Sequence, residues 1–319
     1  MSIRLIARRE ISKLLPMAKA IELMREGVLG LAEGRFEQPV RQRVLTDKGD
    51  LLVKPARLPG EGLCMKLALT YPKNPSLGLP LVQGLVMVFD DDTGEPLAVM
   101  DAAELTAIRT GAGGGLAIEL LARPESESVT LIGTGVQGRF QLLAAMETCA
   151  IRRVFLYDPN RESAEELKAS LEGEADAPEV SILDSADEGV AQSDLVITAT
   201  GSPVPTFSGS AVRPGTHINA IGAYQPDRRE VDEETMRGAY VVVDGYDAAG
   251  LEAGELLMPG IEADADLAEV ATGAKPGRSS NEQVTVFKSV GMAVQDAVAA
   301  VHVFQEAKRL NIGVEVDLF

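Results

Sequence analysis

The feature that most constrains the fold is a glycine-rich turn in the middle of the chain. The run GTGVQG occupies residues 133–138, directly after the short apolar stretch 129–132. The stretch that follows, 139–149, repeats its apolar residues at helical spacing. Strand, glycine turn and helix in this order form the unit that holds the pyrophosphate of a dinucleotide.

Each glycine of this turn has a separate physical role. Gly133 permits the tight turn, Gly135 lets the backbone come close to a pyrophosphate, and Gly138 lets the helix pack closely on the strand. The N-terminus of the following helix offers free N–H groups and a partial positive charge to the phosphates. Glycine-rich turns alone are common, so the interpretation depends on the strand before the turn, the helix after it and the acid described next.

An acidic residue at the end of the next predicted strand supports the same interpretation. Residues 154–157 are apolar, and Asp158 follows them, 20 residues after Gly138. Its carboxylate can accept hydrogen bonds from both ribose hydroxyls and would repel a 2′-phosphate. The sequence therefore favours NAD over NADP as the cofactor. Arg161 is expected to face solvent on a helix that spans residues 161–171.

Apolar runs and helical stretches continue to alternate beyond this point, which predicts a Rossmann-type doubly wound parallel sheet. Ligands of such sheets bind at the carboxyl ends of the strands. Thr200 and Gly222 lie at two of these ends and are candidates for lining the cofactor cleft, although each could equally be a turn residue. The further predicted strands cover 180–183, 194–200, 217–222 and 240–244.

The N-terminal part has a different pattern, with an amphipathic helix that begins near Pro16 and short extended runs separated by turns. These features predict a second domain of the α+β class. The extended runs cover residues 51–53, 63–68 and 81–89.

The C-terminal stretch, 283–319, is expected to be mostly one long helix that packs back on the N-terminal part. The predicted architecture is therefore a Rossmann-type domain, residues 116–294, inserted in a discontinuous α+β domain formed by residues 1–115 and 295–319.

Charge and composition exclude several classes of function. The formal net charge is −18, from 30 Lys and Arg against 48 Asp and Glu, and such an acidic surface repels nucleic acids and anionic membranes. No apolar signal segment follows the N-terminal arginines, and the uncharged run 195–212 is too rich in Gly, Ser, Thr and Pro for a membrane helix. Cys64, Cys149, His217 and His302 do not form a metal-binding or disulfide pattern. We expect a cytoplasmic protein with no metal, no membrane and no nucleic-acid partner.

Three cations of the N-terminal part have unusual surroundings. Lys66 lies within the apolar stretch 63–69, where its ammonium either reaches solvent along an exposed face or is held inside the protein. Arg109 precedes the small residues 110–115, which would let another group approach closely, and Arg41 follows a Pro-Val pair. Arginines beside a nicotinamide would hold an α-carboxylate, because the guanidinium fork binds a carboxylate through two hydrogen bonds.

Ordered sequence segments of a recognisable kind extend over nearly the whole chain: KL at 66–67, YPKNP at 71–75, GLP at 78–80, LAVMD at 97–101, LTAIRT at 105–110, GTGVQ at 133–137, GTHINAIG at 215–222 and FKSVGMA at 287–293. Together they resemble the ornithine cyclodeaminase/mu-crystallin family. The resemblance implies a nicotinamide-dependent enzyme that acts on small amino or imino acids, and a homodimer joined through the non-Rossmann domain, which would also bind the substrate. Its branches include ornithine cyclodeaminase, alanine dehydrogenase, and ketimine or pyrroline-2-carboxylate reductases.

The resemblance also implies roles for individual residues. Arg41, Lys66 and Arg109 match positions that bind the substrate carboxylate and take part in catalysis, with Lys66 as the proton donor. Neighbouring guanidinium charge is expected to lower the pKa of Lys66 toward neutrality. The predicted cofactor-binding residues are Arg109, Gly133, Gly135, Val136, Gln137, Gly138, Asp158, Thr200, Gly222 and Ser289.

Departures from the family patterns bear on the substrate. Cyclodeaminases place acids at the positions of Leu52 and Tyr224, where leucine and tyrosine cannot pair with the distal ammonium of ornithine. We therefore expect hydride transfer between NAD(H) and the α-carbon of a small amino acid or cyclic imino acid. A cyclodeaminase-type lyase that recycles its NAD and a non-catalytic mu-crystallin-like binding protein are the alternatives. Leu52, Gln83, Leu85 and Tyr224 are expected to shape the substrate pocket.

Overall fold

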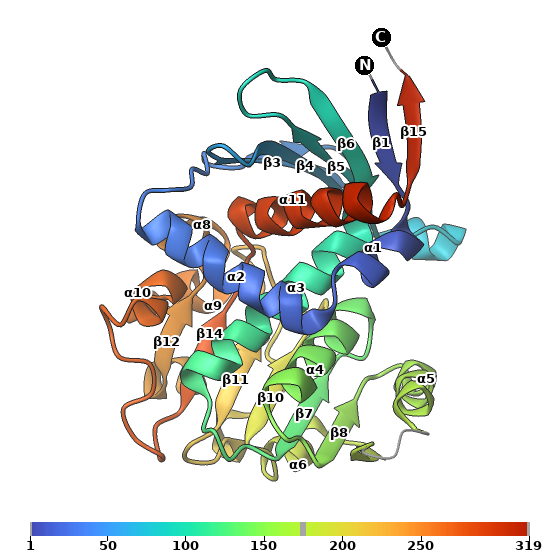
Figure 1. Cartoon of the computed structure of the whole chain (residues 1–319). Helices are drawn as coiled ribbons and strands as arrows, with labels where there is room; N and C mark the ends of the chain where they lie inside the picture. The colour runs from blue at the N-terminus through green and yellow to red at the C-terminus, as the bar shows by residue number, and fades with distance from the viewer. Residues whose placement is uncertain (1, 173–176, 318–319) are drawn as a thin grey trace. The chain divides into compact units, whose positions relative to one another are not determined.

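The structure, a computed structural model, describes residues 2–172 and 177–317. The chain divides into two compact units (Figure 1). We call Met1–Arg109 with Met292–Phe319 the terminal unit, and Thr110–Gly291 the central unit. The predicted domain boundaries differ from these divisions by several residues at each side, and the assignment of the two pieces to substrate and cofactor stays a prediction.

The central unit contains an eight-stranded sheet in the order β13-β12-β14-β11-β10-β7-β8-β9. Every neighbouring pair in this sheet is parallel. The predicted doubly wound parallel sheet is therefore confirmed. The strands are β7 (Ser128–Ile132), β8 (Arg153–Tyr157), β9 (Glu179–Ile182), β10 (Leu195–Thr198), β11 (His217–Ala220), β12 (Tyr240–Val243), β13 (Ala265–Asp266) and β14 (Thr285–Lys288).

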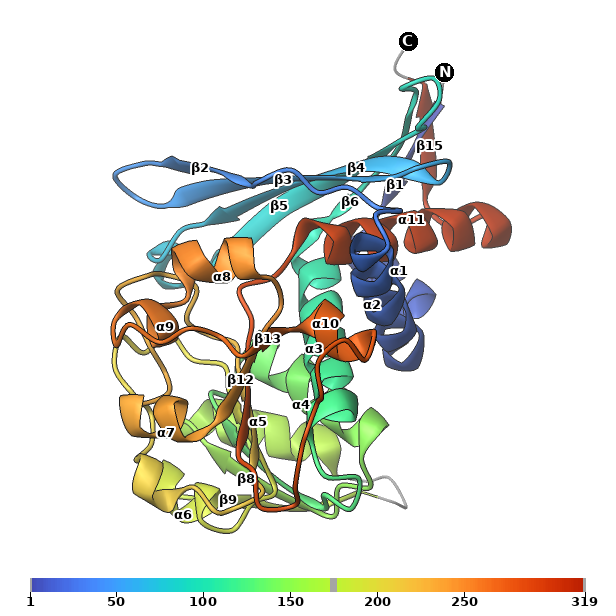
Figure 2. The ribbon, with the colours of Figure 1, turned by 90° about the vertical axis from the view of Figure 1, so that its left-hand side faces the viewer.

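Helices cover both faces of this sheet, which is why its strands read as continuous apolar runs rather than as alternating patterns. Along β10, Leu195 and Ile197 pack into one apolar cluster while Val196 packs into the other. Figure 2 shows α7 and α4 on opposite sides of the sheet. The helices are α4 (Val136–Thr148), α5 (Arg161–Leu171), α6 (Ala186–Val190), η2 (Gly209–Ala211), α7 (Glu233–Gly238), α8 (Tyr246–Glu252), α9 (Gly254–Leu257) and α10 (Leu267–Ala271), with α3 (Ala102–Leu121) crossing the division between the units.

The terminal unit contains a seven-stranded sheet in the order β15-β1-β6-β5-β4-β3-β2, in which only the β1–β6 pair is parallel. Of the three extended runs predicted from the sequence, 51–53 and 63–68 lie within β3 and β4, and 81–89 covers all of β5 and one residue before it. The elements are β1 (Ser2–Ile6), α1 (Arg8–Leu14), α2 (Met17–Ala32), β2 (Gln42–Leu45), β3 (Asp50–Leu58), β4 (Gly62–Thr70), η1 (Asn74–Leu77), β5 (Val82–Phe89), β6 (Pro96–Asp101), α11 (Ala293–Leu310) and β15 (Val314–Asp317).

One face of the seven-stranded sheet is covered by α11, which contacts β3, β4, β5 and β6 (Figure 2). Side chains alternate between the two faces, so Leu52, Lys54 and Ala56 of β3 are buried on the α11 side. The opposite face is apolar and partly exposed; Leu63 and Leu85 on it are 40% and 49% exposed. No helix in the described part of the chain is both long enough and apolar enough to cross a bilayer.

Two predicted helix boundaries are wrong. In the described part of the stretch 283–319, which ends at residue 317, the one helix is α11, and it lies between strands β14 and β15. Asn311 adopts a left-handed conformation (φ 52°) that ends α11. The strand that follows, β15, pairs with β1 from the other end of the chain. The helix expected at 139–149 begins earlier, at Val136, because the backbone after Gly135 is already helical.

Candidate functional site

The glycine-rich loop of the central unit has the geometry of a phosphate cradle. Gly133 has a φ of 93°, and a Cβ on Gly138 would lie 1.9 Å from the carbonyl oxygen of Gly133. The packing of the protein itself therefore requires both glycines. A Cβ on Gly135 would meet nothing within 4 Å, so the protein's own atoms do not require a glycine there. The missing side chain leaves open space at the N-terminus of α4, which fits the approach of a pyrophosphate.

Helix α4 begins without a side-chain cap at Gly135, so its first N–H groups keep their capacity to bind an anion. Val136, the first helical residue, is exposed, and Gln137 is partly buried. The Oε1 atom of Gln137 is buried and has no hydrogen-bond partner among the described residues. The loop thus offers backbone donors for phosphates and one unused side-chain acceptor.

Asp158 follows β8 and is held in place by the same loop. One of its carboxylate oxygens, Oδ2, accepts hydrogen bonds from the backbone N–H of Thr134 (2.8 Å) and from its hydroxyl (3.1 Å). The other, Oδ1, accepts one from the backbone N–H of Asn160 (2.8 Å). Each carboxylate oxygen has further acceptor capacity, so these bonds orient Asp158 and leave it able to bind ribose hydroxyls.

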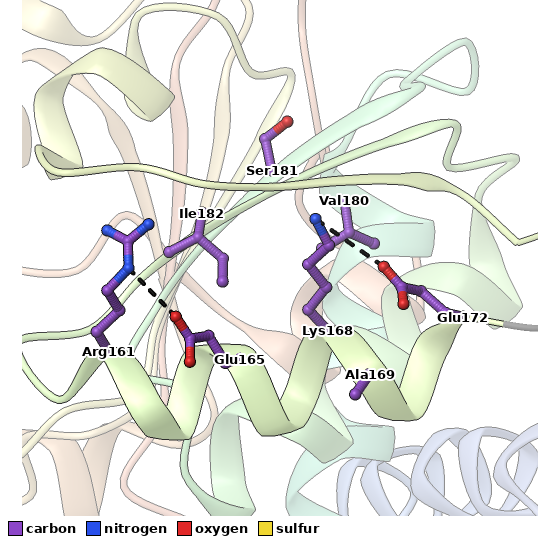
Figure 3. A pocket seen from close by; sticks show the side chains of 8 residues that line it. All are labelled: Arg161, Glu165, Lys168, Ala169, Glu172, Val180, Ser181 and Ile182. Atoms are coloured by element: carbon purple, nitrogen blue, oxygen red, sulfur yellow. Dashed lines mark ion pairs between the residues drawn. The ribbon is translucent and has the colours of Figure 1, made fainter.

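Arg161 lies on the surface of α5, as expected from the sequence. Figure 3 shows it with Glu165 at one end of a surface pocket of about 520 Å³ between α5 and β9. Its guanidinium pairs with Glu165 (3.4 Å) and Asp184 (2.9 Å). A cofactor 2′-phosphate would have to compete with these two carboxylates for Arg161.

A buried carboxylate joins the loops after β10 and β11. Glu230 accepts hydrogen bonds on Oε1 from the N–H and the hydroxyl of Thr200 (2.6 and 2.7 Å), and on Oε2 from the N–H of Gly222 (2.6 Å) and of Ala223 (3.1 Å). A Cβ on Gly222 would lie 2.2 Å from the carbonyl oxygen of Thr200, so this glycine is needed for packing. Both predicted cofactor-lining residues are thus positioned by Glu230, which the sequence analysis did not identify.

Glu230 is completely buried, and burial raises its pKa. Its own N–H donates to Glu255 (3.0 Å), and Glu255 pairs with Lys288 (3.0 Å), also inside the protein. Near the end of β14, Ser289 donates its hydroxyl to Asp244 (2.9 Å). These contacts fix the carboxyl edge of the sheet without using the acceptor capacity of the Ser289 oxygen.

In the terminal unit, three residues that are far apart in the sequence meet inside the protein. The Oδ1 atom of Asp296 accepts hydrogen bonds from the Nζ of Lys66 (2.7 Å) and the Nε of Arg109 (2.8 Å). β4 supplies the lysine, α3 the arginine and α11 the aspartate. The Oδ2 atom of Asp296 is buried and has no hydrogen-bond partner in the described part of the chain. We call Lys66, Arg109 and Asp296 the buried triad.

The remaining polar contacts orient this triad. Lys66 also donates to the Thr106 hydroxyl (2.9 Å), and Arg109 donates through one terminal nitrogen to Gln295 (3.1 Å). Lys66 is 2% exposed, so the alternative in which its ammonium reaches solvent is wrong. By their chemistry, a lysine, an arginine and an aspartate in this arrangement can supply a proton donor, a carboxylate-binding cation and a counter-charge.

The charges within the triad shift its proton affinities. Burial, followed by the charge of Arg109, lowers the pKa of Lys66 to about 8 despite the opposing effect of Asp296. Burial opposes ionisation of Asp296, but the charges of Arg109, Lys66 and Lys54 outweigh it and lower its pKa to about 2. Asp296 is therefore ionised at neutral pH, while Lys66 exchanges its proton near neutrality. The direction expected for Lys66 is correct, although burial is the larger cause.

Asp296 and Lys54 were missed at the sequence level. Asp296 is the one charged residue in the otherwise apolar or neutral run 289–305, which is a signal of a buried acid on a helix. Lys54 occupies a position of β3 where the alternation requires a buried side chain. Arg41, just before β2, is close enough to lower the pKa of Lys54 through its charge.

Other expectations about this region need correction. The small residues after Arg109 accommodate protein rather than ligand, since a Cβ on Gly111 would lie 2.5 Å from the carbonyl oxygen of Phe140 in α4. Gln83 and Leu85 do not share a pocket with Lys66. They pair with Leu69 and Leu67, whose side chains lie on the sheet face away from α11.

The sequence profile of the ornithine cyclodeaminase/mu-crystallin family matches residues 3–311 of the chain. The chain belongs to this family. The resemblance inferred from the sequence is thereby confirmed. The ketimine reductase mu-crystallin of Mus musculus is 40% identical over 271 residues, which are 84% of this chain and 84% of that protein.

Two solved structures of family members closely match the fold. A Thermococcus litoralis Δ1-pyrroline-2-carboxylate reductase in complex with NADH and L-proline is 35% identical, with a TM-score of 0.93 over 98% of this chain and 100% of that chain. An archaeal alanine dehydrogenase dimer with bound NAD is 34% identical, with a TM-score of 0.95 over the whole of both chains.

Proposed function

We propose that this family member is an oxidoreductase that transfers hydride between NAD(H) and the α-carbon of a small amino acid or cyclic imino acid. The observation that carries the proposal is the buried triad, because a carboxylate-binding cation and a proton donor at the same place suit an α-imino acid. The likeness to a reductase solved with NADH and L-proline supports it.

The triad assigns separate roles to its members. Arg109 makes no hydrogen bond through Nη2 to a described residue, and this nitrogen can bind the substrate carboxylate, assisted by Arg41. Lys66 gives its proton to the nitrogen of the reduced substrate and takes it back in the oxidative direction. Asp296 keeps Lys66 in place and stabilises its charged form.

The central unit would hold the cofactor. The glycine-rich loop and the N-terminus of α4 would bind the pyrophosphate, and Asp158 would accept hydrogen bonds from the adenosine ribose. Thr200, Gly222 and Ser289 would line the edge where the nicotinamide binds. The bound cofactor supplies or accepts the hydride. The orientation of Asp158 by Thr134 favours NAD over NADP.

We also propose a homodimer in the cytoplasm. The seven-stranded sheet of the terminal unit has an apolar face on the side away from α11. Side chains on this face, such as those of Leu63 and Leu85, are partly exposed to solvent. A patch of this kind is typical of a protein interface. The archaeal alanine dehydrogenase is a dimer, and light scattering of the purified protein would test the same state here.

An activity screen with NADH and NADPH tests the proposed function. Its substrates would be pyruvate with ammonia, pyrroline-2-carboxylate, piperideine-2-carboxylate and ornithine. We expect NADH oxidation with at least one imino acid. Ammonia release from ornithine without a net change in NADH absorbance would instead establish the lyase. Tight ligand binding without turnover of any substrate would establish a binding protein.

A further inference from the structure

Lys54 is a buried cation of the terminal unit that the proposed function does not use. Lys54 of β3 lies directly opposite Lys66 of β4 in the antiparallel register. Side chains paired in this way lie on the same face of the sheet, with Cβ atoms about 5 Å apart. Lys54 is 4% exposed and Lys66 2%, so the fold brings two lysines together inside the protein on the side covered by α11.

Three of the four charges that act most strongly on the pKa of Lys54 are positive. Besides burial, its pKa is lowered by the charges of Lys66, Arg109 and Arg41, while Asp296 acts in the opposite direction. Together these effects place the pKa well below that of an ordinary lysine. This part of the protein therefore already resists an additional positive charge.

A bound substrate carboxylate would make the surroundings of Lys54 less positive. The negative charge compensates the surrounding cations and favours the protonated form of Lys54. A second ammonium on the substrate side chain would restore the excess of positive charge. At an effective dielectric constant of about 20, one like charge about 5 Å away weakens binding by about a hundredfold.

We propose that Lys54 makes the substrate site selective for amino and imino acids without a distal cation, and that it excludes diamino acids such as ornithine. This inference rests on the proposed function, because it assumes that Lys66 and Arg109 bind the substrate. It narrows the substrate class to small acids with neutral or anionic side chains. Lys54 is then a residue that determines specificity.

Three amino acids of nearly equal size separate charge from shape. L-Norvaline has an apolar side chain, 5-hydroxynorvaline adds a neutral polar end, and L-ornithine places an ammonium at the same position. Their dissociation constants would be measured with the enzyme saturated with NAD. We expect ornithine to bind about a hundredfold more weakly than norvaline, and 5-hydroxynorvaline to bind within about tenfold of norvaline.

The variants Lys54→Met and Lys54→Gln remove the amine while keeping a side chain of similar length. Each should reduce the ratio between norvaline and ornithine by about a hundredfold, so that the two dissociation constants become similar. Lys48→Met, in the exposed turn before β3, is the matched control and should keep the wild-type ratio. The use of two variants guards against a folding defect in either one.

Two results would overturn the inference: ornithine and norvaline binding with similar affinity to the wild type, or an unchanged ratio in both Lys54 variants. Failure of the proposed function has a different signature. In that case the discrimination between ornithine and norvaline is present, but no imino acid supports NADH oxidation.

Discussion

The glycine-rich loop of the central unit and the buried triad of the terminal unit are built in opposite ways. The loop is one continuous segment, in which Gly133 has a φ of 93° and Gly138 packs against the carbonyl oxygen of Gly133 only five residues away. The triad joins Lys66 to Asp296 across 230 positions of the sequence. Loop function therefore follows from local backbone geometry, whereas triad function depends on packing between a strand and two helices.

The two regions also differ in electrostatics. The loop presents backbone N–H groups, whose partial charges do not depend on pH. The triad contains ionised side chains in a buried environment, where proton affinities depend on every neighbour. Changes in the triad should alter chemistry and its pH dependence, and changes in the loop should alter cofactor affinity or the stability of the fold.

The largest effect is expected from Lys66→Ala. Loss of the proton donor should reduce turnover by about a thousandfold, because positioned acid–base groups contribute on this scale. Steady-state assays with the preferred imino acid would measure the loss. Lys13→Ala, on the exposed side of α1, is a suitable control. Turnover near the wild-type value in Lys66→Ala would remove the triad from the mechanism.

A pair of alanine variants in the loop separates folding from cofactor binding. Gly138→Ala places a Cβ against the carbonyl oxygen of Gly133 and should cost about 2 kcal/mol of unfolding free energy. Gly135→Ala projects into open space, so the fold should keep its stability while NADH binds about tenfold more weakly. Denaturant unfolding and NADH titration measure the two effects. Equal losses of stability would contradict the role given to Gly135.

The preference between NADH and NADPH tests the role proposed for Asp158, which follows the second strand of the strand–helix–strand unit. Asp158→Ser should reduce the preference for NADH over NADPH by about tenfold to a hundredfold, mainly by improving NADPH binding, since one unit charge no longer repels the 2′-phosphate. Titrations with both cofactors would show this. Arg161→Ala is the companion variant. If the wild type already binds NADPH as well as NADH, the role assigned to Asp158 is wrong.

The smallest expected effect is a gradual pH dependence of kcat/KM, which we attribute to the triad and not to the loop. Lys66, with a pKa of about 8, must be protonated to act as a donor. The kcat/KM for imino acid reduction should therefore be constant below pH 8 and fall about tenfold per pH unit above it. Amino acid oxidation should show the reverse. Lys66→Arg, which holds its proton throughout this range, should lack the break. A profile that is flat through pH 8 in the wild type would contradict the assignment.

The sequence by itself determined the family, the parallel sheet and the position of the glycine-rich loop. These features are encoded in short segments, where periodicity and glycine positions reflect contacts between neighbours in the chain. Asp158 could be identified for the same reason, because it lies at a fixed distance from the loop along one strand–helix–strand unit.

The tertiary structure decided which side chains act together. Leu85 was expected to shape the substrate pocket, but the register of β5 places it on the sheet face opposite to that of Lys66. Lys54, Glu230 and Asp296 showed no motif, yet each is buried among partners supplied by distant elements. The cost of burying a charge is set by all the groups around it, and only the folded chain brings those groups within reach of one another.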